Sequence, residues 1–581
     1  MCNHNTSSTY GNRLEHGKEA HEKHHKAWNR RQFMTSSLLG AAGAFLLNNL
    51  PVSALSPTPL NIALNNTETD RILVLINLAG GNDGLNMLVP YTNNQNRRSQ
   101  YEVLRNGSSR WSTSNLTPLN NFSYDTFSSG DMALPTNEMA AAINFWNNDA
   151  LAIVPNVGYL NESHSHFEAT KIWESGSNKN TSDDRWGVGW TGRYFDDLLP
   201  AFLDTPPTCP PALQIGFNGN LVFNNEDGLG MGLTFKDPEE FYRFALSGEL
   251  YNTSVPDNCP QSLGIAFVRQ VANNSVRYAG SVKEAYNLAA NDVNYSTTPN
   301  KGLGEQLAIV SRLIKGNLGT KVYLVTLDGF DNHGGLMNNH PPLLQEISEA
   351  VNAFYEDLKT KGREQQVLTM TYSEFGRTLK SNSNNGTDHG SVAPVLLFGE
   401  GVNSGFFSEP VNLNSNAMIN QSNTNFGSQL NNGTSTQRPA VADFRTIYAT
   451  LLKDWLCVDA NIVNAVIGED NNNNIIQAIP NLIANPCTPS HVASASLLGH
   501  HYSLNNPNII EIKYALRKKG TVRLRLIVGQ DQILMVEKFQ KAGSYTHYFD
   551  RSKHPSLPAS QYDYILETGG ERYKRKVTIY P

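Results

Sequence analysis

The chain has 581 residues, a formal net charge of −6, and 39% hydrophobic and 17% charged residues, a balance typical of a globular protein with a polar surface. Its mild acidity argues against nucleic acid as the main partner, because proteins that follow a phosphate backbone usually present a basic face. The length exceeds that at which one hydrophobic core usually stops growing, so we expect a large main domain and at least one smaller unit.

The first 54 residues have the pattern of a twin-arginine signal peptide. Arg30 and Arg31 precede an apolar run rich in Gly and Ala, Met34 to Leu47, and small residues at 52–54 suit a cleavage site. The run is too short to span a bilayer, and no longer one follows, so we expect no transmembrane segment in the mature chain. We expect export by the twin-arginine translocase to the periplasm or cell surface, with a linker at 55–70; the alternative is a buried N-terminal helix.

Four cysteines remain beyond this signal: Cys209, Cys259, Cys457 and Cys487. An even number in an oxidising compartment makes disulfides plausible, and four cysteines allow three pairings. Proximity along the chain favours Cys209–Cys259 and Cys457–Cys487, although the sequence leaves the pairing open. Their wide spacing gives no zinc-finger pattern.

Residues 71–490 have the pattern of a three-layer α/β/α sandwich. Three continuous apolar runs, at 71–77, 321–327 and 366–372, are typical of parallel strands buried on both faces. Helix-like stretches at 305–315 and 343–359 lie between them, as in a mostly parallel sheet covered by helices. In such sheets the functional site lies beyond the carboxyl ends of the strands.

The last part of the chain changes character. After a linker at 491–507, residues 508–581 alternate apolar and polar side chains, with glycines between the runs, and are locally basic. The pattern predicts a small antiparallel β-sandwich as a separate module.

Polar motifs follow each of the three predicted core strands. After the first, glycines flank Asp83 and would let the backbone approach a ligand; a tight turn with a capping aspartate is the alternative. After the second, Asp331 and His333 are two residues apart, so both can bind one metal ion or act as a pair. After the third, the adjacent Asp388 and His389 point to opposite sides and could reach two ions. Solvated loops would explain each motif singly, but three at three strand ends favour a metal site.

A fourth motif, residues 161–168, leads into a helical stretch at 169–174. A serine such as Ser165 at a helix start is usually its N-cap. The same position suits a nucleophile that attacks a phosphate or sulfate ester, because helix amides stabilise anions there. His164 and His166 favour a polar site, although both could be surface residues.

Taken together, these motifs resemble the domain-of-unknown-function 1501 family over about residues 70 to 460. The resemblance rests on the segments 80–86, 165–169, 189–193, 330–333, 373–378 and 386–390. The family is grouped with the alkaline phosphatase and sulfatase superfamily, which implies the α/β/α fold and metal-assisted ester hydrolysis.

The resemblance also implies roles for single residues. Ser165 corresponds to the nucleophile, and the metal ligands correspond to Asp83, Asp331, His333, Asp388 and His389. Asn82 and Arg377 are candidates for substrate binding, with Asp328, Glu374 and His166 as possible further site residues. The ion would be zinc, manganese, magnesium or calcium. The superfamily's last histidine has no counterpart within the matched stretch, so a two-zinc site is incomplete or uses Glu374.

The tail resembles a type IX secretion sorting domain, especially at 557–567 and 574–580. This implies the type IX secretion machinery as a partner; a β-sandwich that binds carbohydrate or protein is the alternative. For the whole chain, the main hypothesis is an exported hydrolase of phosphate or sulfate esters. The competing hypothesis is a non-catalytic periplasmic or cell-surface binding protein with the same fold.

Overall fold

The computed structural model describes most of the chain after residue 70. The described residues are 44–47, 50–53, 70–120, 123–124, 127–159, 163–177, 189–198, 209–216, 221–223, 232–247, 278–295, 302–411, 413, 442–458, 460–468, 475–487, 495–502, 508–516, 519–529, 531–541, 543–558, 560–569 and 571–579. Arg30, Arg31 and Cys259 lie outside them, so the twin-arginine signal and the Cys209–Cys259 bond stay predictions.

One large mixed sheet organises the main domain. Its strands, in spatial order, are β1 (Ala44–Leu47), β2 (Leu50–Ser53), β11 (Gly232–Phe235), β10 (Ala212–Ile215), β12 (Val322–Asp328), β3 (Ile72–Ala79), β13 (Val367–Tyr372), β14 (Ala393–Phe398), β9 (Leu151–Gly158) and β15 (Gly405–Phe406), with β16 (Ala442–Asp443) also paired to β9. The five strands from β11 to β13 are parallel, and β14 is antiparallel to both neighbours. The three core strands predicted from apolar runs are therefore confirmed as neighbours: β12, β3 and β13.

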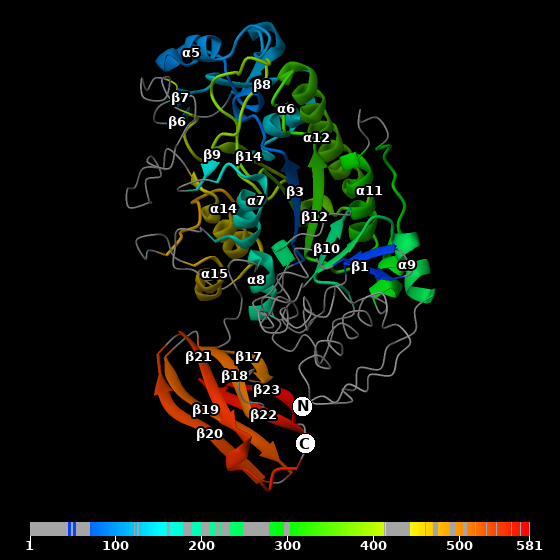
Figure 1. Ribbon diagram of the computed structural model, residues 1–581, viewed down its shortest axis with the longest axis vertical. Helices are drawn as coiled ribbons and strands as arrows, with labels where there is room; N and C mark the ends of the chain where they lie inside the picture. Colours follow the sequence, from blue (N-terminus) through cyan, green and yellow to red (C-terminus); the bar gives the residue numbers. More distant parts are fainter. Residues whose placement is uncertain are drawn as a thin grey trace, which may run out of the picture.

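Two faces of this sheet are buried, which explains why its strands are apolar without alternation. In β3, Ile72, Val74 and Ile76 belong to one hydrophobic core, whereas Leu73 and Leu75 belong to another. The first core is covered by α6 (Ala140–Asn147), α11 (Gly302–Lys315) and α12 (Leu336–Lys359), and the second by α7 (His166–Ser175), α8 (Trp190–Leu198), α14 (Phe444–Thr450) and α15 (Ala460–Ile467). Figure 1 shows α11 and α12 on one side of β3 and β12, with α7 and α14 on the other. The three-layer α/β/α sandwich is confirmed.

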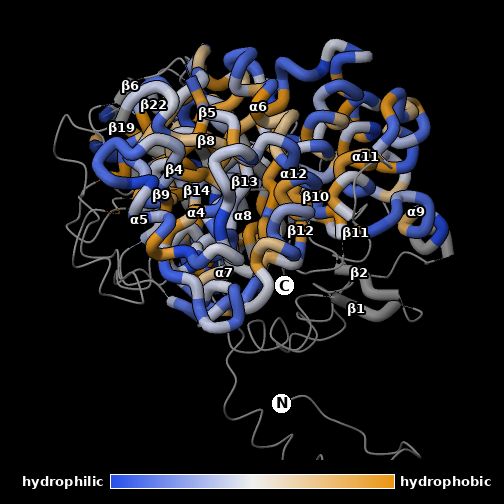
Figure 2. Tube along the Cα trace, turned by 90° about the horizontal axis from the view of Figure 1, so that it is seen from above, coloured by the Kyte–Doolittle hydropathy of each residue, from blue (hydrophilic) through white to orange (hydrophobic). Residues whose placement is uncertain are grey.

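Shorter elements complete the domain around this core. They are α4 (Gly84–Met87), α5 (Arg97–Leu104), α9 (Pro238–Ser247), the small sheet of β4 (Val89–Pro90), β8 (Met132–Pro135) and β5 (Leu116–Pro118), the hairpin β6 (Ser123–Tyr124) and β7 (Phe127–Ser128), and a π-helical turn at Leu451–Trp455. Seen from above, hydrophobic stretches fill the middle of the domain and hydrophilic ones lie mostly at its periphery (Figure 2).

The predicted helices are found with longer bounds. The stretch expected at 305–315 belongs to α11, and that at 343–359 forms the last part of α12, which begins seven residues earlier at Leu336. Proline removes a helix hydrogen bond, and Pro341 and Pro342 lie in the second turn of α12, past the first-turn positions where a missing N–H costs little. No helix in the described part of the chain has the length and apolar character needed to cross a bilayer.

The strands β1 and β2 fall within the segment expected to be the signal peptide. They form an antiparallel pair, and Ser53 of β2 pairs with Thr234 of β11 at the edge of the main sheet. Export of the chain stays a prediction.

One of the two expected disulfides is present. Cys457 and Cys487 are bonded across 30 residues, and Cys209 is buried and free of any bond to the described cysteines. The bond ties the segment after the π-helical turn to residues 475–487, whose Leu482 and Ile483 pack in the second core.

Removing this bond is expected to lower the free energy of unfolding. The double variant Cys457→Ser/Cys487→Ser should lose about 2–4 kcal/mol, because the unfolded chain regains the freedom of a 30-residue loop. Urea unfolding followed by tryptophan fluorescence measures the loss, and wild-type protein in reducing buffer is the matched control. An unchanged urea midpoint in both samples would contradict the prediction.

The C-terminal residues form two antiparallel sheets packed face to face, as predicted. One contains β17 (Ala495–Tyr502), β18 (Ile509–Leu516) and β21 (Gly543–Asp550); the other contains β20 (Asp531–Gln540), β19 (Gly520–Val528), β22 (Ser560–Thr568) and β23 (Glu571–Ile579). Side chains from both sheets, such as Ile512 and Leu524, share one buried core. Because β17 pairs with β18, the unit includes residues that were expected to be a linker at 491–507. Its role in sorting stays a prediction.

Candidate metal site

The carboxyl ends of β3, β12 and β13 carry three loops that meet around the side chain of Arg377. Its Nε donates to the Gly81 carbonyl (2.8 Å), its Nη1 to the Thr387 carbonyl (3.0 Å), and its Nη2 to the carbonyls of Phe330 (3.2 Å) and Gly80. The side chain is fully buried. Arg377 was expected to bind substrate oxygens, but the structure uses its donors to hold the loops together.

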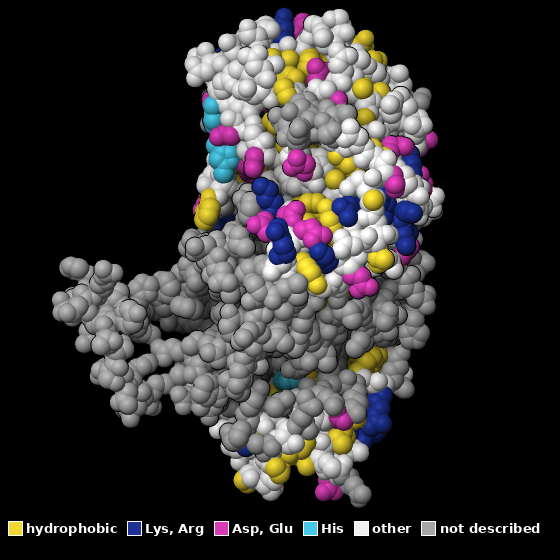
Figure 3. All heavy atoms as spheres, turned by 90° about the vertical axis from the view of Figure 1, so that its right-hand side faces the viewer, with side chains coloured by type: hydrophobic (Ala, Val, Ile, Leu, Met, Phe, Trp, Pro, Cys, Tyr) yellow, Lys and Arg dark blue, Asp and Glu magenta, His cyan; other side chains and the backbone are white. Residues whose placement is uncertain are grey.

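Asp331 lies at the centre of the site. Its Oδ1 accepts a hydrogen bond from Arg377 Nη2 (2.5 Å) and faces three imidazoles. The Nε2 atoms of His333, His389 and His166 lie 3.1, 3.3 and 3.6 Å from this oxygen. We call these three histidines and Asp331 the three-histidine cluster. Figure 3 shows histidine and acidic side chains gathered at one rim of the described surface.

The outer nitrogen of each imidazole is held by an acceptor. His166 Nδ1 lies 2.8 Å from Glu374 Oε1, and His389 Nδ1 lies 2.7 Å from the His164 carbonyl. His333 Nδ1 lies 3.1 Å from Asp388 Oδ1. A carbonyl or an ionised carboxylate only accepts, so each Nδ1 must carry the proton. In the neutral state all three Nε2 atoms therefore turn a lone pair toward Asp331.

This arrangement fits a metal ion. His333 Nε2 and His389 Nε2 are 3.0 Å apart, so two lone pairs would repel unless a proton or a cation lay between them. Ligands about 2.0–2.1 Å from a tetrahedral ion are roughly 3.3–3.4 Å from one another. The four distances given above, from 3.0 to 3.6 Å, are close to this value. The ligand atoms of His166, Asp331 and His389 all lie within 4.8 Å of one another, and His333 joins this group through Asp331 and His389. Small side-chain rotations, mainly of His166, would close the cluster around an ion.

Electrostatics keeps the central groups ready to bind a cation. Partial burial would raise the pKa of Asp331, but its bond to Arg377 holds that pKa below the ordinary value. Burial lowers the pKa of His389, which favours its neutral form. The hydrogen bond from His166 to Glu374 raises the pKa of His166, so an ion must compete with a proton for this ring. A carboxylate behind a ligating histidine is a common support in metal sites, because it fixes the ring and its tautomer.

Asp83 was expected to be a metal ligand, and the structure gives it another role. It is the N-cap of α4, and its carboxylate accepts from Asn86 N (3.1 Å). Arg105 binds both of its oxygens, at 2.7 and 3.0 Å, and Thr387 Oγ1 donates to one of them (3.0 Å). Burial would raise the pKa of Asp83, but the Arg105 charge keeps it low. The capping alternative for this loop is the one that the structure supports.

The other candidates near the strand ends surround the cluster. Asn82, a candidate for substrate binding, is buried, and its side chain contacts His340 and Met87. Glu374 Oε1 accepts from Gly80 N (2.8 Å) as well as from His166. Asp328 is exposed at the end of β12, and no hydrogen bond joins it to the cluster in the described part of the chain.

Ser165 is exposed directly before α7 and is followed by His166 of the three-histidine cluster. Its side chain makes no capping hydrogen bond, while its carbonyl accepts from Ala169 N (2.9 Å). His166 had been expected only as a possible extra residue. The sequence signal for it was a pair of histidines at a helix start, which also describes a solvated surface turn.

His340 lies next to the site, and the sequence analysis did not identify it. It lies in α12, its Nε2 contacts Asn82 Oδ1 (3.0 Å), and its Nδ1 has no hydrogen-bond partner among the described residues. Burial lowers its pKa to about 4, so the ring is neutral at pH 7. Nothing in the local sequence separates a buried histidine of this kind from an exposed one.

We expect His340 to make the fold sensitive to acid. The unfolded chain takes up this proton below pH 6.5, whereas the folded protein resists it until about pH 4. Stability contributed by the neutral ring is thus complete above pH 6.5 and is lost as pH falls to 4, by about 3 kcal/mol. Urea unfolding at pH 7 and 4, in chelator, should show a smaller pH effect in His340→Gln than in wild type. Equal pH effects in the two proteins would argue against this assignment.

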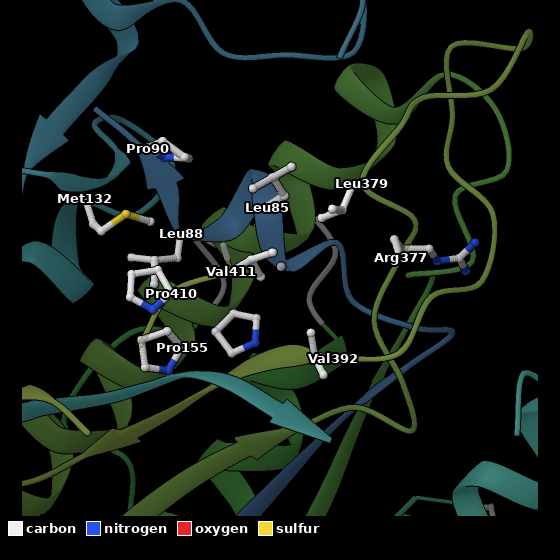
Figure 4. Close-up of a pocket in the computed structure, with 12 residues that line it drawn as sticks. Leu85, Leu88, Pro90, Met132, Pro155, Arg377, Leu379, Val392, Pro410 and Val411 are labelled. Atoms are coloured by element: carbon white, nitrogen blue, oxygen red, sulfur yellow. The ribbon is translucent and has the colours of Figure 1, made fainter. Parts of the chain in front are cut away.

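A small apolar cavity lies behind Arg377, on the side away from the cluster. Its lining is mostly leucine, valine and proline, as at Leu85, Val392 and Pro394. Figure 4 shows the guanidinium turned away from these side chains. The cavity brings no titratable groups together, so the chemistry of the site belongs to the cluster.

The fold and the site define an α/β/α protein with a histidine–aspartate cluster at the carboxyl edge of its sheet. Residues 269–424 match the model of a family described as "Protein of unknown function (DUF1501)". This stretch is less than half of the chain and holds Asp331, His333 and His389, but neither Ser165 nor His166. No curated protein matches the sequence.

Several solved structures are similar in fold at low sequence identity. A protein of the alkaline phosphatase superfamily from Vibrio parahaemolyticus has 9% identity over 91% of this chain and 94% of its own, with a TM-score of 0.28. The PsFucS1 sulfatase from Pseudoalteromonas sp. has 10% identity over 88% and 91%, with a TM-score of 0.29. Alkaline phosphatase from the Antarctic bacterium TAB5 has 10% identity over 60% and 97%, with a TM-score of 0.24. At such values, the function of this chain must be argued from its own residues.

Proposed function

We propose that the protein is a metal-dependent hydrolase of phosphate or sulfate esters that acts outside the cytoplasm. The observation that carries the proposal is the convergence of three imidazole Nε2 atoms on Asp331 Oδ1, with every Nδ1 held by an acceptor. A bound divalent ion would lower the pKa of a water or hydroxyl and offset the negative charge of the ester.

Ser165 is the proposed nucleophile. It is exposed, its hydroxyl is not used as a cap, and the next residue reaches the cluster. The amides of the first turn of α7 point toward the same end of the helix, where they and the helix dipole favour an anion. Arg377 keeps Asp331 oriented and ionised rather than binding the ester itself.

Localisation remains part of the proposal. Export by the twin-arginine translocase suits a site whose ligands come from three separate segments, because that route carries chains that have already folded. Transfer to the cell surface by the type IX secretion machinery would use the C-terminal β-sandwich.

A non-catalytic binding protein is the second candidate function. Arg377 and Asp83, two groups expected to serve substrate or metal, are both committed to internal hydrogen bonds. Such a site could bind a ligand through a metal ion without hydrolysing it.

The two functions differ in the behaviour of Ser165→Ala. The mature protein, loaded with zinc, manganese, magnesium or calcium, is assayed on a panel of aryl phosphates and sulfates. For a hydrolase, we expect Ser165→Ala to lower kcat by on the order of 10³-fold or more, as for other nucleophiles. Ser163→Ala is the matched control, because the Ser163 hydroxyl donates to Glu168 (2.8 Å). No turnover with any metal, or equal turnover in wild type and Ser165→Ala, would count against the hydrolase.

A further inference from the structure

The number of ions in the site can be argued from charges that the structure fixes. The resemblance to alkaline phosphatases implies two zinc ions, with Asp83 and Asp388 among their ligands. The structure commits Asp83 elsewhere and uses one oxygen of Asp388, whose side chain is 58% exposed. Asp83 is buried against Arg105, and Asp388 Oδ1 accepts from His333 Nδ1 and Asn382 Nδ2, each at 3.1 Å.

A second divalent ion would also meet a fixed positive charge. The Arg377 guanidinium lies 2.5 Å from the Asp331 oxygen that the imidazoles face. It cannot move aside easily, because it is fully buried and donates to four carbonyls of the surrounding loops. Two cations near one carboxylate repel each other strongly in a partly buried site. One fixed guanidinium and one ion are therefore the charges that Asp331 can accommodate.

The donor atoms indicate which kind of ion fits. Three imidazole nitrogens and one carboxylate suit zinc and its neighbours among the transition metals. Calcium and magnesium prefer six or more oxygen ligands, and the cluster offers a single carboxylate. The acceptors behind the three rings add to the preference, since they raise the basicity of the ligating nitrogens.

We propose that the three-histidine cluster holds one divalent transition-metal ion of the zinc class, with the Arg377 guanidinium as the second positive charge of the site. This inference rests on the metal site of the proposed function, but not on hydrolysis. It replaces the two-ion site implied by the resemblance with a site of different stoichiometry and selectivity.

The test uses the full chain and does not need activity. Protein stripped with a chelator is titrated with Co²⁺ while its visible absorption is recorded, and the bound metal is then counted by mass spectrometry. We expect one Co²⁺ per chain with intense bands typical of four ligands, displaced by one equivalent of Zn²⁺ but not by Ca²⁺ or Mg²⁺ in large excess. His333→Ala should abolish the bands, whereas His554→Ala, in the C-terminal sandwich, should leave them unchanged.

Glu374→Gln tests the carboxylate behind His166 with the ligands intact. The amide oxygen can keep both bonds of Glu374 Oε1, to Gly80 N and His166 Nδ1, but the charge that makes the ring more basic is lost, so we expect Co²⁺ affinity to fall by up to about 10–100-fold. A second equivalent of tightly bound metal, displacement by Ca²⁺ or Mg²⁺, or intact bands in His333→Ala would each overturn the proposal.

Parallel ester assays separate this inference from the proposed function. One bound ion without turnover of any ester leaves the inference standing and removes the hydrolase. Two bound ions together with turnover would overturn the inference and support the hydrolase. Protein that binds no transition metal overturns both.

Discussion

Asp83→Ala is expected to lower the free energy of unfolding by about 3–5 kcal/mol, because it leaves the Arg105 guanidinium buried without its counter-charge. Both side chains are almost completely buried, and the carboxylate meets Arg105 through two bonds of 2.7 and 3.0 Å. The same change removes the N-cap of α4 and the acceptor of the Thr387 hydroxyl. The metal content of the folded fraction should nevertheless stay at the wild-type level, since Asp83 is no part of the cluster.

A double-mutant cycle distinguishes this role from metal binding. Urea unfolding of Asp83→Ala, Arg105→Ala and the double variant should show a coupling, with the double variant losing less than the sum of the two single losses. Additive losses would mean that the pair is not coupled. Loss of metal from folded Asp83→Ala would restore the ligand role implied by the resemblance.

Much of the scaffold could be predicted from the sequence because buried parallel strands leave a local signal. The runs at 71–77, 321–327 and 366–372 are mostly apolar and do not alternate with polar residues, and they became β3, β12 and β13 in the middle of the sheet. The strand rule then placed Asp331, His333 and His389 at one edge. For these strands and the residues that follow them, the local sequence was enough to predict their place in the sheet.

The rest of the site depends on partners that are distant in the chain. Arg105 lies 22 residues from Asp83, and Thr387 lies 304 residues from it. Arg377 reaches a carbonyl 296 residues away at Gly81. A single sequence gives the residue types at such positions but not the contacts that decide between ligand and support. The motif around Asp83 therefore looked like a metal ligand, although its chemistry is that of a buried ion pair.

The same reasoning makes Asp331 the residue on which the site depends most. Asp331→Asn keeps the shape of the side chain and removes its negative charge, so the three imidazoles would share an ion with no anionic ligand. Losing a group that merely supports a ligand costs about 10–100-fold in metal affinity, and losing the only carboxylate should cost at least about 100-fold. The fold should survive, because the Asp331 side chain is 50% exposed.

Asp328→Asn is the matched control for this prediction. It removes the same charge three residues earlier, at the exposed end of β12, outside the cluster. Zinc affinity is measured by competition with a coloured chelator, and ester hydrolysis is followed in the same preparations. We expect Asp331→Asn to lose both and Asp328→Asn to retain both, because position in the cluster matters here and not the net charge of the loop. Equal zinc affinity in the two variants would mean that the imidazoles converge on Asp331 as an ion pair rather than as a metal site.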